Sequence, residues 1–318
     1  MSVTTSIKKI LPGKLKIFLR IMYTTRNWWD VLFLRLGLKK DCIAVLRKGY
    51  RVPLDGSWRQ WKLFMSYVDL LRENSEAEVI GGNKVKIRYR GRELFFNVGK
   101  FGVNMPFDDI FLREPYKKFV EEFDIRDRVV IDIGANLGDT AIYFALWGAR
   151  HVYAYEAFPG QGRLAQENVK LNGLGDKCDV FIAAVGGKSG IFTEDPNFYL
   201  FASDPNINLL LEGMEPGEKI HILTLKEIVD RLGIDHAFLK IDCEGYEYDI
   251  VLNASTETLK RFDYIVVEYH YGFEDLKKKF LEAGFVVKYT EPEHSPPPYT
   301  FPKDSREWDV GYIVASRN

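Results

Sequence analysis

A glycine-containing turn near the middle of the chain joins an apolar segment to a helical one. The run is VVIDIGANLGDT over residues 129–140, and Asp132 stands just before Gly134. Glycines at such a turn let backbone approach a ligand, and the helix that follows offers free N–H groups. The turn is typical of the ligand-binding corner of a β-α-β unit, so we expect the chain to fold around a parallel sheet.

Short apolar segments alternate with helical patterns on both sides of this turn. The expected strands are residues 129–133, 151–156, 179–185, 237–241, 264–269, 285–289 and 310–315, and the expected helices are residues 140–147, 161–172, 246–252 and 273–283. The alternation predicts a doubly wound, mostly parallel sheet with right-handed crossovers, whose ligands bind at the carboxyl ends of the strands. Two long connections, residues 186–218 and 291–302, interrupt it and are expected near that ligand edge.

The chain before this region divides into two parts. Residues 1–40 hold nine lysines and arginines and one aspartate, although the whole chain has a formal net charge of −1. Residues 41–107 predict a small α+β lead-in. Its expected elements are a strand with a turn at 43–54, a helix at 57–72 and a hairpin at 79–98. We therefore expect three parts: a basic amphipathic helical head (1–40), the lead-in (41–107) and the ligand-binding domain (108–318), which begins with a helix at 108–122.

The basic head has two interpretations. No run approaches the roughly 20 apolar residues that span a bilayer, and no secretory signal pattern is present. A basic amphipathic helix with Trp28 and Trp29 suits the surface of an anionic membrane. The alternative is a helix or helix pair that packs on the rest of the protein. The chain has three cysteines and no C-x-x-C pair, which indicates a reducing, cytoplasmic compartment.

The chemistry of the turn favours S-adenosylmethionine over a dinucleotide. Asn136 stands at the second glycine position of a G-x-G-x-x-G motif, and Asp132 would repel a pyrophosphate. S-adenosylmethionine carries a sulfonium and an amino group and no phosphate, so carboxylates beside it are favourable. Glu156, which ends the second strand, is placed to accept two ribose hydroxyls. The alternative is a packed β-α-β unit with no ligand.

Two further segments bring polar residues to strand ends. LKIDCEGYE at 239–247 places Lys240 and Asp242 in an apolar strand, which is costly unless they pair or serve a ligand. A structural ion pair is the alternative there. IVVEYHY at 265–271 adds a glutamate and His270, and a histidine of near-neutral pKa is a natural general base for a hydroxyl. His270 could equally be structural.

Taken together, these segments resemble the FkbM family of S-adenosylmethionine-dependent methyltransferases. The resemblance covers about residues 108–317 and is carried by VVIDIGANLGDTAIYFA, YAYEAFP, ENVKLNGL, AAVG, LKIDCEGYEYDIV and IVVEYHYGF. It implies a Rossmann-like class I methyltransferase fold, with a seven-stranded, mostly parallel sheet whose last strand is antiparallel. It also implies O-methylation of a sugar, a glycan or another polyhydroxylated metabolite. Ala157 departs from the family, which commonly has proline after the glutamate.

The motifs and the resemblance together assign the site. The expected cofactor-binding residues are Asp132, Gly134, Asn136, Gly138, Asp139, Thr140, Glu156 and Ala184, and the expected catalytic residues are Lys240, Asp242, Glu244 and His270. We expect no metal. The alternative is a divalent cation held by Asp242, Glu244, Glu268 and His270.

Two competing functions stay open. The basic head suggests an RNA methyltransferase, but the chain has no N-P-P-Y or D-P-P-Y motif at the fourth strand and no interleaved aromatic and basic residues in its second half. The partners we expect are a small-molecule or glycan acceptor and no nucleic acid. A membrane-associated protein with a relic cofactor site would have lost some of the acidic and glycine residues, and all are present.

Overall fold

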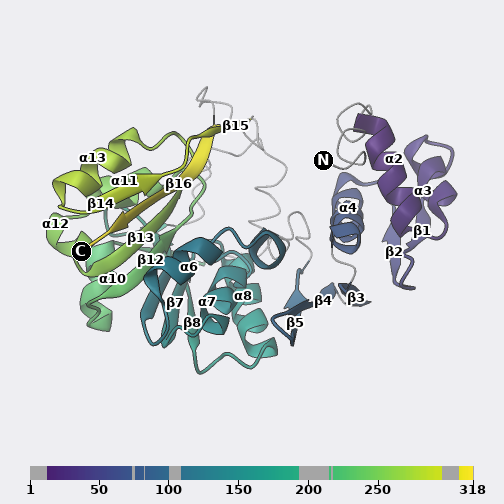
Figure 1. Ribbon diagram of the computed structural model, residues 1–318. Helices are drawn as coiled ribbons and strands as arrows, with labels where there is room; N and C mark the ends of the chain where they lie inside the picture. The colour runs from purple at the N-terminus through teal and green to yellow at the C-terminus, as the bar shows by residue number, and fades with distance from the viewer. Residues whose placement is uncertain are drawn as a thin grey trace. The chain divides into compact units, whose positions relative to one another are not determined.

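The computed structural model describes residues 13–73, 76–81, 83–99, 109–192, 215, 218–295 and 308–317. The chain separates into two compact units, Met1–Arg113 and Glu114–Asn318. The expected division at residues 107 and 108 falls outside the described residues, as does the start of the basic head. Each unit is described here by itself (Figure 1).

The first unit combines helices with two small antiparallel sheets. Its helices are α2 (Gly13–Thr24), α3 (Trp28–Arg35) and α4 (Trp58–Glu73). One sheet pairs β1 (Cys42–Val45) with β2 (Arg51–Leu54), and the other has the order β3 (Glu78–Gly81), β4 (Lys84–Tyr89) and β5 (Arg92–Asn97). The predicted lead-in elements are therefore present, and β3 is an additional strand that pairs with the predicted hairpin.

The described part of the basic head is a pair of helices that belongs to this unit. Helix α2 packs against α4, and α3 packs against β1. Arg20 of α2 pairs with Asp69 of α4 at 3.2 Å, and Val31 of α3 is completely buried. The head thus contributes to the core of the first unit. Within the described residues, no helix is both long and apolar enough to span a bilayer.

The second unit is built on one large sheet. The strands lie in the order β8 (Cys178–Ile182), β7 (His151–Glu156), β6 (Val129–Ile133), β12 (Ala237–Ile241), β13 (Phe262–Tyr269), β16 (Trp308–Ser316) and β14 (Val286–Tyr289). Strand β16 runs antiparallel to both of its neighbours, and β15 (Glu293–Ser295) pairs with it off this path. The predicted Rossmann-like, seven-stranded, mostly parallel sheet is confirmed, with its last strand antiparallel.

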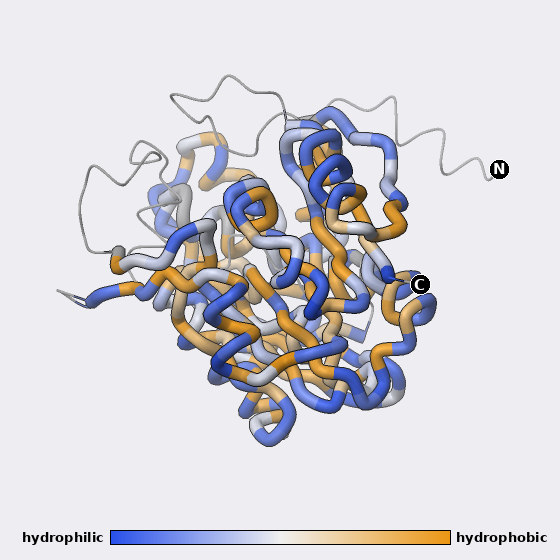
Figure 2. Tube along the Cα trace, turned by 90° about the vertical axis from the view of Figure 1, so that its left-hand side faces the viewer, coloured by the Kyte–Doolittle hydropathy of each residue, from blue (hydrophilic) through white to orange (hydrophobic). Residues whose placement is uncertain are grey.

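Helices pack on this sheet (Figure 1). They are α6 (Lys117–Phe123), α7 (Asp139–Leu146), α8 (Pro159–Leu171), α10 (Leu225–Leu232), α11 (Glu247–Asn253), α12 (Thr256–Leu259) and α13 (Glu274–Glu282). Because side chains alternate along a strand, neighbouring residues of β12 face different helices. Leu239 belongs to a buried cluster with Ile228 of α10 and Val251 of α11, whereas Phe238 packs on Phe144 of α7 with ring centroids 5.5 Å apart. Hydrophobic and hydrophilic stretches alternate along the trace of the chain (Figure 2).

Two expected elements are interrupted. The helix expected at 108–122 is a π-helical turn at Asp109–Arg113 followed by α6, because Glu114 adopts a left-handed φ of 48° that ends one helix before the next begins. The strand expected at 179–185 splits into β8 and β9 (Ala184–Val185). Strand β9 leaves the large sheet and pairs with β11 (Ile220–Leu223), which in turn pairs with β10 (Gly190–Phe192).

The two long connections are partly described. Residues 186–218 include β10, and residues 193–214, 216 and 217 lie outside the described residues. Residues 291–302 include β15, and residues 296–307 lie outside them. The expectation that these connections form the ligand edge therefore stays a prediction.

Two glycines of the turn are required by backbone packing. Gly134 has a φ of 78°, and a Cβ atom there would lie 1.8 Å from the carbonyl oxygen of Asp242. Gly138 has a φ of 79°, and a Cβ atom there would lie 3.1 Å from the Cα atom of Ala165 in α8. From the sequence, we expected these glycines to let a ligand approach the backbone. In the structure, each glycine is also required because a neighbouring backbone atom occupies the space of a Cβ atom.

We expect Gly134→Ala to lower the free energy of unfolding more than Gly173→Ala. Both positions have a left-handed φ, but a Cβ atom at Gly173 meets nothing within 4 Å among the described residues. Both variants carry the strain of that backbone conformation. Only Gly134→Ala adds an overlap between the new Cβ atom and the carbonyl oxygen of Asp242, which should cost about 1–3 kcal/mol more. Urea unfolding followed by circular dichroism measures the difference. Equal losses in the two variants would contradict the close approach of Gly134 and Asp242.

Candidate active site

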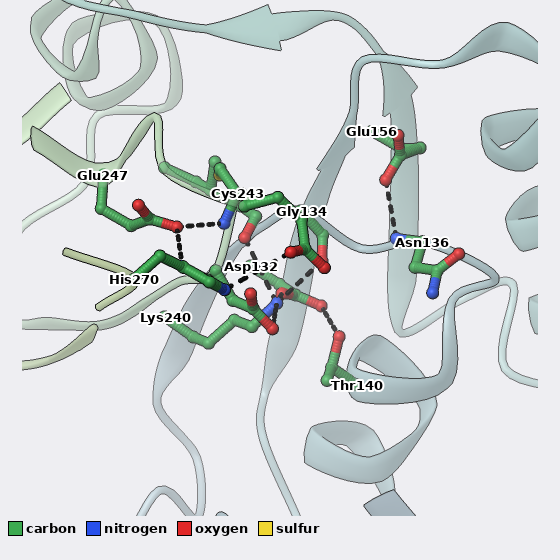
Figure 3. A network of polar contacts seen from close by, with 12 residues as sticks. Asp132, Gly134, Asn136, Thr140, Glu156, Lys240, Cys243, Glu247 and His270 are labelled. Atoms are coloured by element: carbon green, nitrogen blue, oxygen red, sulfur yellow. Dashed lines mark hydrogen bonds and ion pairs between the residues drawn. The ribbon is translucent and has the colours of Figure 1, made fainter. Parts of the chain in front are cut away.

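A buried lysine connects the two central strands of the sheet. Lys240 on β12 is 1% exposed, and its Nζ atom lies 3.1 Å from Oδ1 of Asp132 on β6. Nζ also donates to the carbonyl oxygens of Gly134 at 2.8 Å and Ile133 at 3.3 Å. The pairing follows from the register, in which Lys240 lies directly beside Asp132. Figure 3 shows this contact at the centre of the polar network.

Lys240 stays protonated in this setting. Burial alone would lower the pKa of Lys240, but the charges of Asp132 and Asp242 outweigh burial and raise the pKa above its usual value. A permanently charged ammonium cannot take a proton from an acceptor. Lys240, which we expected among the catalytic residues, therefore has the contacts of a residue that positions the glycine turn.

Several predicted cofactor residues lie buried beneath the glycine turn. The Thr140 hydroxyl donates to Oδ2 of Asp132 at 2.5 Å, and both side chains are buried. Asp139 is 2% exposed, and burial raises its pKa to about 7. Asn136 is partly exposed and has a left-handed φ of 47°. Of these residues, Asn136 and the backbone near it face outward, whereas Asp132, Asp139 and Thr140 lie inside.

Glu156 lies at the end of β7, as the sequence predicts, and it holds the turn through the backbone. Its Oε2 atom accepts from the N–H of Asn136 at 2.7 Å (Figure 3), and Oε1 accepts from the N–H of Phe158 at 2.9 Å. Burial raises the pKa of Glu156 to about 7. Each carboxylate oxygen has a second lone pair, so both can still accept a hydroxyl. Ala184 is partly exposed and belongs to β9, outside the large sheet.

Glu247 is a central residue of the site to which the sequence assigned no role. It is completely buried at the start of α11, and its Oε1 atom accepts three hydrogen bonds. The donors are the N–H of Cys243 at 2.8 Å, the N–H of Gly245 at 3.1 Å and Nδ1 of His270 at 3.0 Å. One carboxylate oxygen thus fixes both the turn after β12 and the imidazole after β13.

The pKa of His270 is not near neutral. The ring is 3% exposed, and its Nε2 atom faces Oε2 of Glu244 at 3.5 Å while Nδ1 contacts Glu247. Burial alone would lower the pKa of His270, but the hydrogen bond and charge of Glu247, with Asp242 and Glu244, raise it to about 10. An imidazole held as a cation between carboxylates is not the ready general base that the sequence suggested.

Three carboxylates form the more open end of the site. The side chain of Asp242 is 28% exposed and that of Glu244 is 67% exposed. Glu268 is partly exposed, and burial, together with the charge of Asp242, raises its pKa to about 8. Because Ile241 pairs with Val267 in parallel register, Asp242, just after β12, and Glu268, near the end of β13, follow these paired residues side by side. The acidic residues are therefore gathered beside the glycine turn, where an acceptor could meet a bound cofactor.

Comparison with known proteins identifies this half of the chain. Residues 132–287 match the family model described as the methyltransferase FkbM domain. The second unit is an FkbM methyltransferase domain. The matched residues include both the glycine turn and the acidic end of the site.

More distant likenesses concern methyltransferases as well. Protein arginine N-methyltransferase 1 of Oryza sativa subsp. indica is 29% identical over 146 residues, which cover 40% of this chain and 36% of the rice protein. The chain thus spans little more than a third of that relative. A SAM-dependent methyltransferase from Agrobacterium tumefaciens aligns with a TM-score of 0.44 at 14% identity, over 76% of this chain and 72% of that one. The complex of aTrm5 with tRNALeu aligns with a TM-score of 0.40 at 13% identity, over 74% and 53%.

We expect Lys240→Met to destabilise the FkbM domain strongly. Removal of the ammonium leaves Asp132 as an uncompensated buried charge, which costs about 3–5 kcal/mol. The matched control is Lys226→Met, because Lys226 pairs with Asp230 on the exposed surface of α10, where a pair contributes about 0–1 kcal/mol. Urea unfolding of both variants measures the contrast. Similar losses in the two variants would contradict the structural role of Lys240.

Proposed function

We propose that the protein transfers the methyl group of S-adenosylmethionine to a hydroxyl group of a sugar, a glycan or another polyhydroxylated metabolite. The observation that carries the proposal is the position of Asp242. Its backbone lies against Gly134 of the turn, and its N–H donates to the carbonyl oxygen of Ile133 at 3.1 Å. A partly exposed carboxylate is thereby held at the edge of the turn to which we assign the cofactor.

The residues of the turn fit the proposed cofactor. The groups nearest to it are carboxylates and backbone amides, and Lys240, the buried cation beside it, is committed to Asp132 and two carbonyl oxygens. That set suits a cationic, phosphate-free ligand. Glu156 would hold the ribose hydroxyls, and the backbone near Asn136 would lie along the adenosine. When bound, S-adenosylmethionine supplies a methyl group on a sulfonium, a leaving group that departs as a neutral thioether.

Methyl transfer to a hydroxyl forms a C–O bond, breaks a C–S bond and releases the hydroxyl proton. Positioning of the two reactants supplies much of the acceleration of such a displacement. Asp242 can accept the proton, because its carboxylate is partly exposed beside the turn, and the ammonium of Lys240 at 3.9 Å favours the ionised form that has room for a proton. The role of Lys240 is to hold the turn, and that of Glu247 is to hold the loop that carries Asp242 and Glu244.

We expect Asp242→Asn to abolish methyl transfer and to leave the affinity for S-adenosylmethionine unchanged, because the amide accepts no proton.

Glu156→Ala should instead weaken the binding of S-adenosylmethionine. The variant loses two charge-assisted hydrogen bonds to the ribose, each contributing at most about 1.5–3 kcal/mol. Calorimetry with S-adenosylmethionine and transfer of a labelled methyl group to a panel of glycans and polyols measure both effects.

The result that would overturn the proposal is an Asp242→Asn variant with the wild-type rate. A control, Glu282→Gln on the exposed side of α13, should match the wild type in both measurements. Bulk RNA serves as a competing acceptor in the same assay. Transfer to RNA and to none of the glycans or polyols would replace the proposed acceptor with a nucleic acid.

We also propose that the helices of the first unit contact an anionic membrane surface at its periphery. On α2, Leu15, Leu19 and Tyr23 follow one another at intervals of four residues and are exposed, and Trp29 and Phe33 on α3 are exposed as well. The same segment carries the excess of lysines and arginines. Each basic residue near an anionic leaflet contributes about 1 kcal/mol, so binding should be reversible and should weaken with salt.

Flotation with liposomes tests this contact. The intact protein should float with phosphatidylserine-containing liposomes at low salt and should be released at high salt. Replacement of Leu15, Leu19 and Tyr23 by serine should abolish flotation, whereas Leu281→Ser, at an exposed leucine of α13, should not. An intact protein that does not float at low salt would leave α2 and α3 with a packing role.

A further inference from the structure

The strand ends of β12 and β13 place three ligating side chains around one point. Asp242, Glu268 and His270 each offer one atom, and the three atoms all lie within 4.8 Å of one another. Oxygen ligands bind divalent cations at about 2.0–2.6 Å, so atoms on one ion are separated by no more than about twice that distance. The three side chains are therefore spaced as ligands of a single ion would be.

The imidazole of His270 is fixed by an acceptor on its far side. Glu247 accepts from Nδ1 at 3.0 Å, while Nε2 is the ring atom that faces Glu244. A carboxylate behind a histidine sets the tautomer and the ring orientation, and metal-binding histidines almost always have such a partner. Glu247 is itself fixed by the N–H groups of Cys243 and Gly245. The arrangement directs Nε2 toward the carboxylates.

A buried hydroxyl lies beside the strand that carries Glu268. The hydroxyl of Tyr116, at the start of α6, is completely buried and has no hydrogen-bond partner among the described residues. The Tyr116 ring packs on Tyr312 with ring centroids 5.9 Å apart, and Tyr312 pairs with Glu268 in the sheet. The neighbourhood of Glu268 thus holds a buried donor whose partner is not a described protein group.

Lys240 lies 3.9 Å from Asp242, but it is shared with Asp132 and with the carbonyl oxygens of Ile133 and Gly134. The imidazole of His270 would give up its Nε2 proton when an ion binds there, and its Nδ1 atom would stay bonded to Glu247. Two carboxylates side by side repel each other unless a cation lies near both. A small cation between them would remove this repulsion.

We propose that Asp242, Glu268 and His270 bind one divalent cation of the Mn²⁺ type, with Glu247 as the residue that positions His270. Two carboxylates and one imidazole suit such an ion and leave coordination positions open. The binding of the ion does not depend on the proposed function, but its role does. In methyl transfer to a hydroxyl, the ion would bind hydroxyl oxygens of the acceptor and favour loss of the hydroxyl proton, which passes to Asp242 or to solvent. A polyhydroxylated acceptor with two adjacent oxygens fits an ion with open positions.

The binding of Mn²⁺ itself tests the site without any assay of activity. The full-length protein is treated with a chelator, dialysed and titrated with Mn²⁺, and the free ion is followed by electron paramagnetic resonance. We expect one Mn²⁺ per chain in the wild type. Glu268→Gln should weaken binding at least tenfold, and Glu247→Gln should weaken it by about 10–100-fold through His270. Glu282→Gln, an exposed acid on α13, should bind as the wild type does.

Two further measurements separate this proposal from the proposed function. Affinity for S-adenosylmethionine should be the same in Glu268→Gln and the wild type, which shows that the variant is folded. No binding of Mn²⁺ at millimolar concentration, or wild-type binding by Glu268→Gln, overturns the cation site. If Mn²⁺ does not bind and methyl transfer continues at the full rate in chelator, the proposed function holds without a metal ion. If Mn²⁺ binds as expected but no methyl group is transferred, the site stands and the proposed function fails.

Discussion

The ion pair between Lys240 and Asp132 is the interaction on which the site depends. It joins β6 to β12 in the middle of the sheet, with both side chains at most 1% exposed. Because the same ammonium donates to the carbonyl oxygens of Ile133 and Gly134, it fixes the turn as well as the strands. An isolated charge in this interior would be prohibitively costly, so each partner requires the other.

The position of this pair in the sheet explains why so many polar residues meet there. Strands β6, β7 and β8 extend to one side and β12 and β13 to the other, so the loops after β6 and β12 leave the sheet where the strand order reverses. The turn at Gly134 and the loop at residues 242–246 meet there in direct backbone contact. Glu156 extends the site toward β7, and Glu268 and His270 extend it toward β16. The residues proposed for the cofactor and those proposed for the acceptor thus occupy neighbouring strand ends on opposite sides of the Lys240–Asp132 pair.

The sequence predicts the sheet well because each central strand is a short apolar run with a polar residue at a fixed place. For the same reason it places Asp132, Glu156, Lys240 and Asp242 at or near the ends of these strands, as the structure has them, whereas their roles stay predictions. The role of Glu247 could not be predicted, since its bond to His270 joins residues that are far apart in sequence and meet only because β12 and β13 are neighbours. The same contact makes the imidazole a cation, which no local pattern indicates. The break at Glu114 also has no local signal, because any residue can be forced into a left-handed conformation by its surroundings.

The contact between Gly134 and the backbone of Asp242 has a consequence for protein engineering. The two segments belong to different halves of the fold, but the carbonyl oxygen of one occupies the space that a side chain of the other would fill. A loop grafted from another methyltransferase at residues 133–138 would therefore have to match the backbone path after β12. Chimeras that exchange the halves between β8 and β12 would inherit two loops that were not shaped together. Recombination that keeps both loops from one parent avoids this mismatch and leaves the outer strands free to vary.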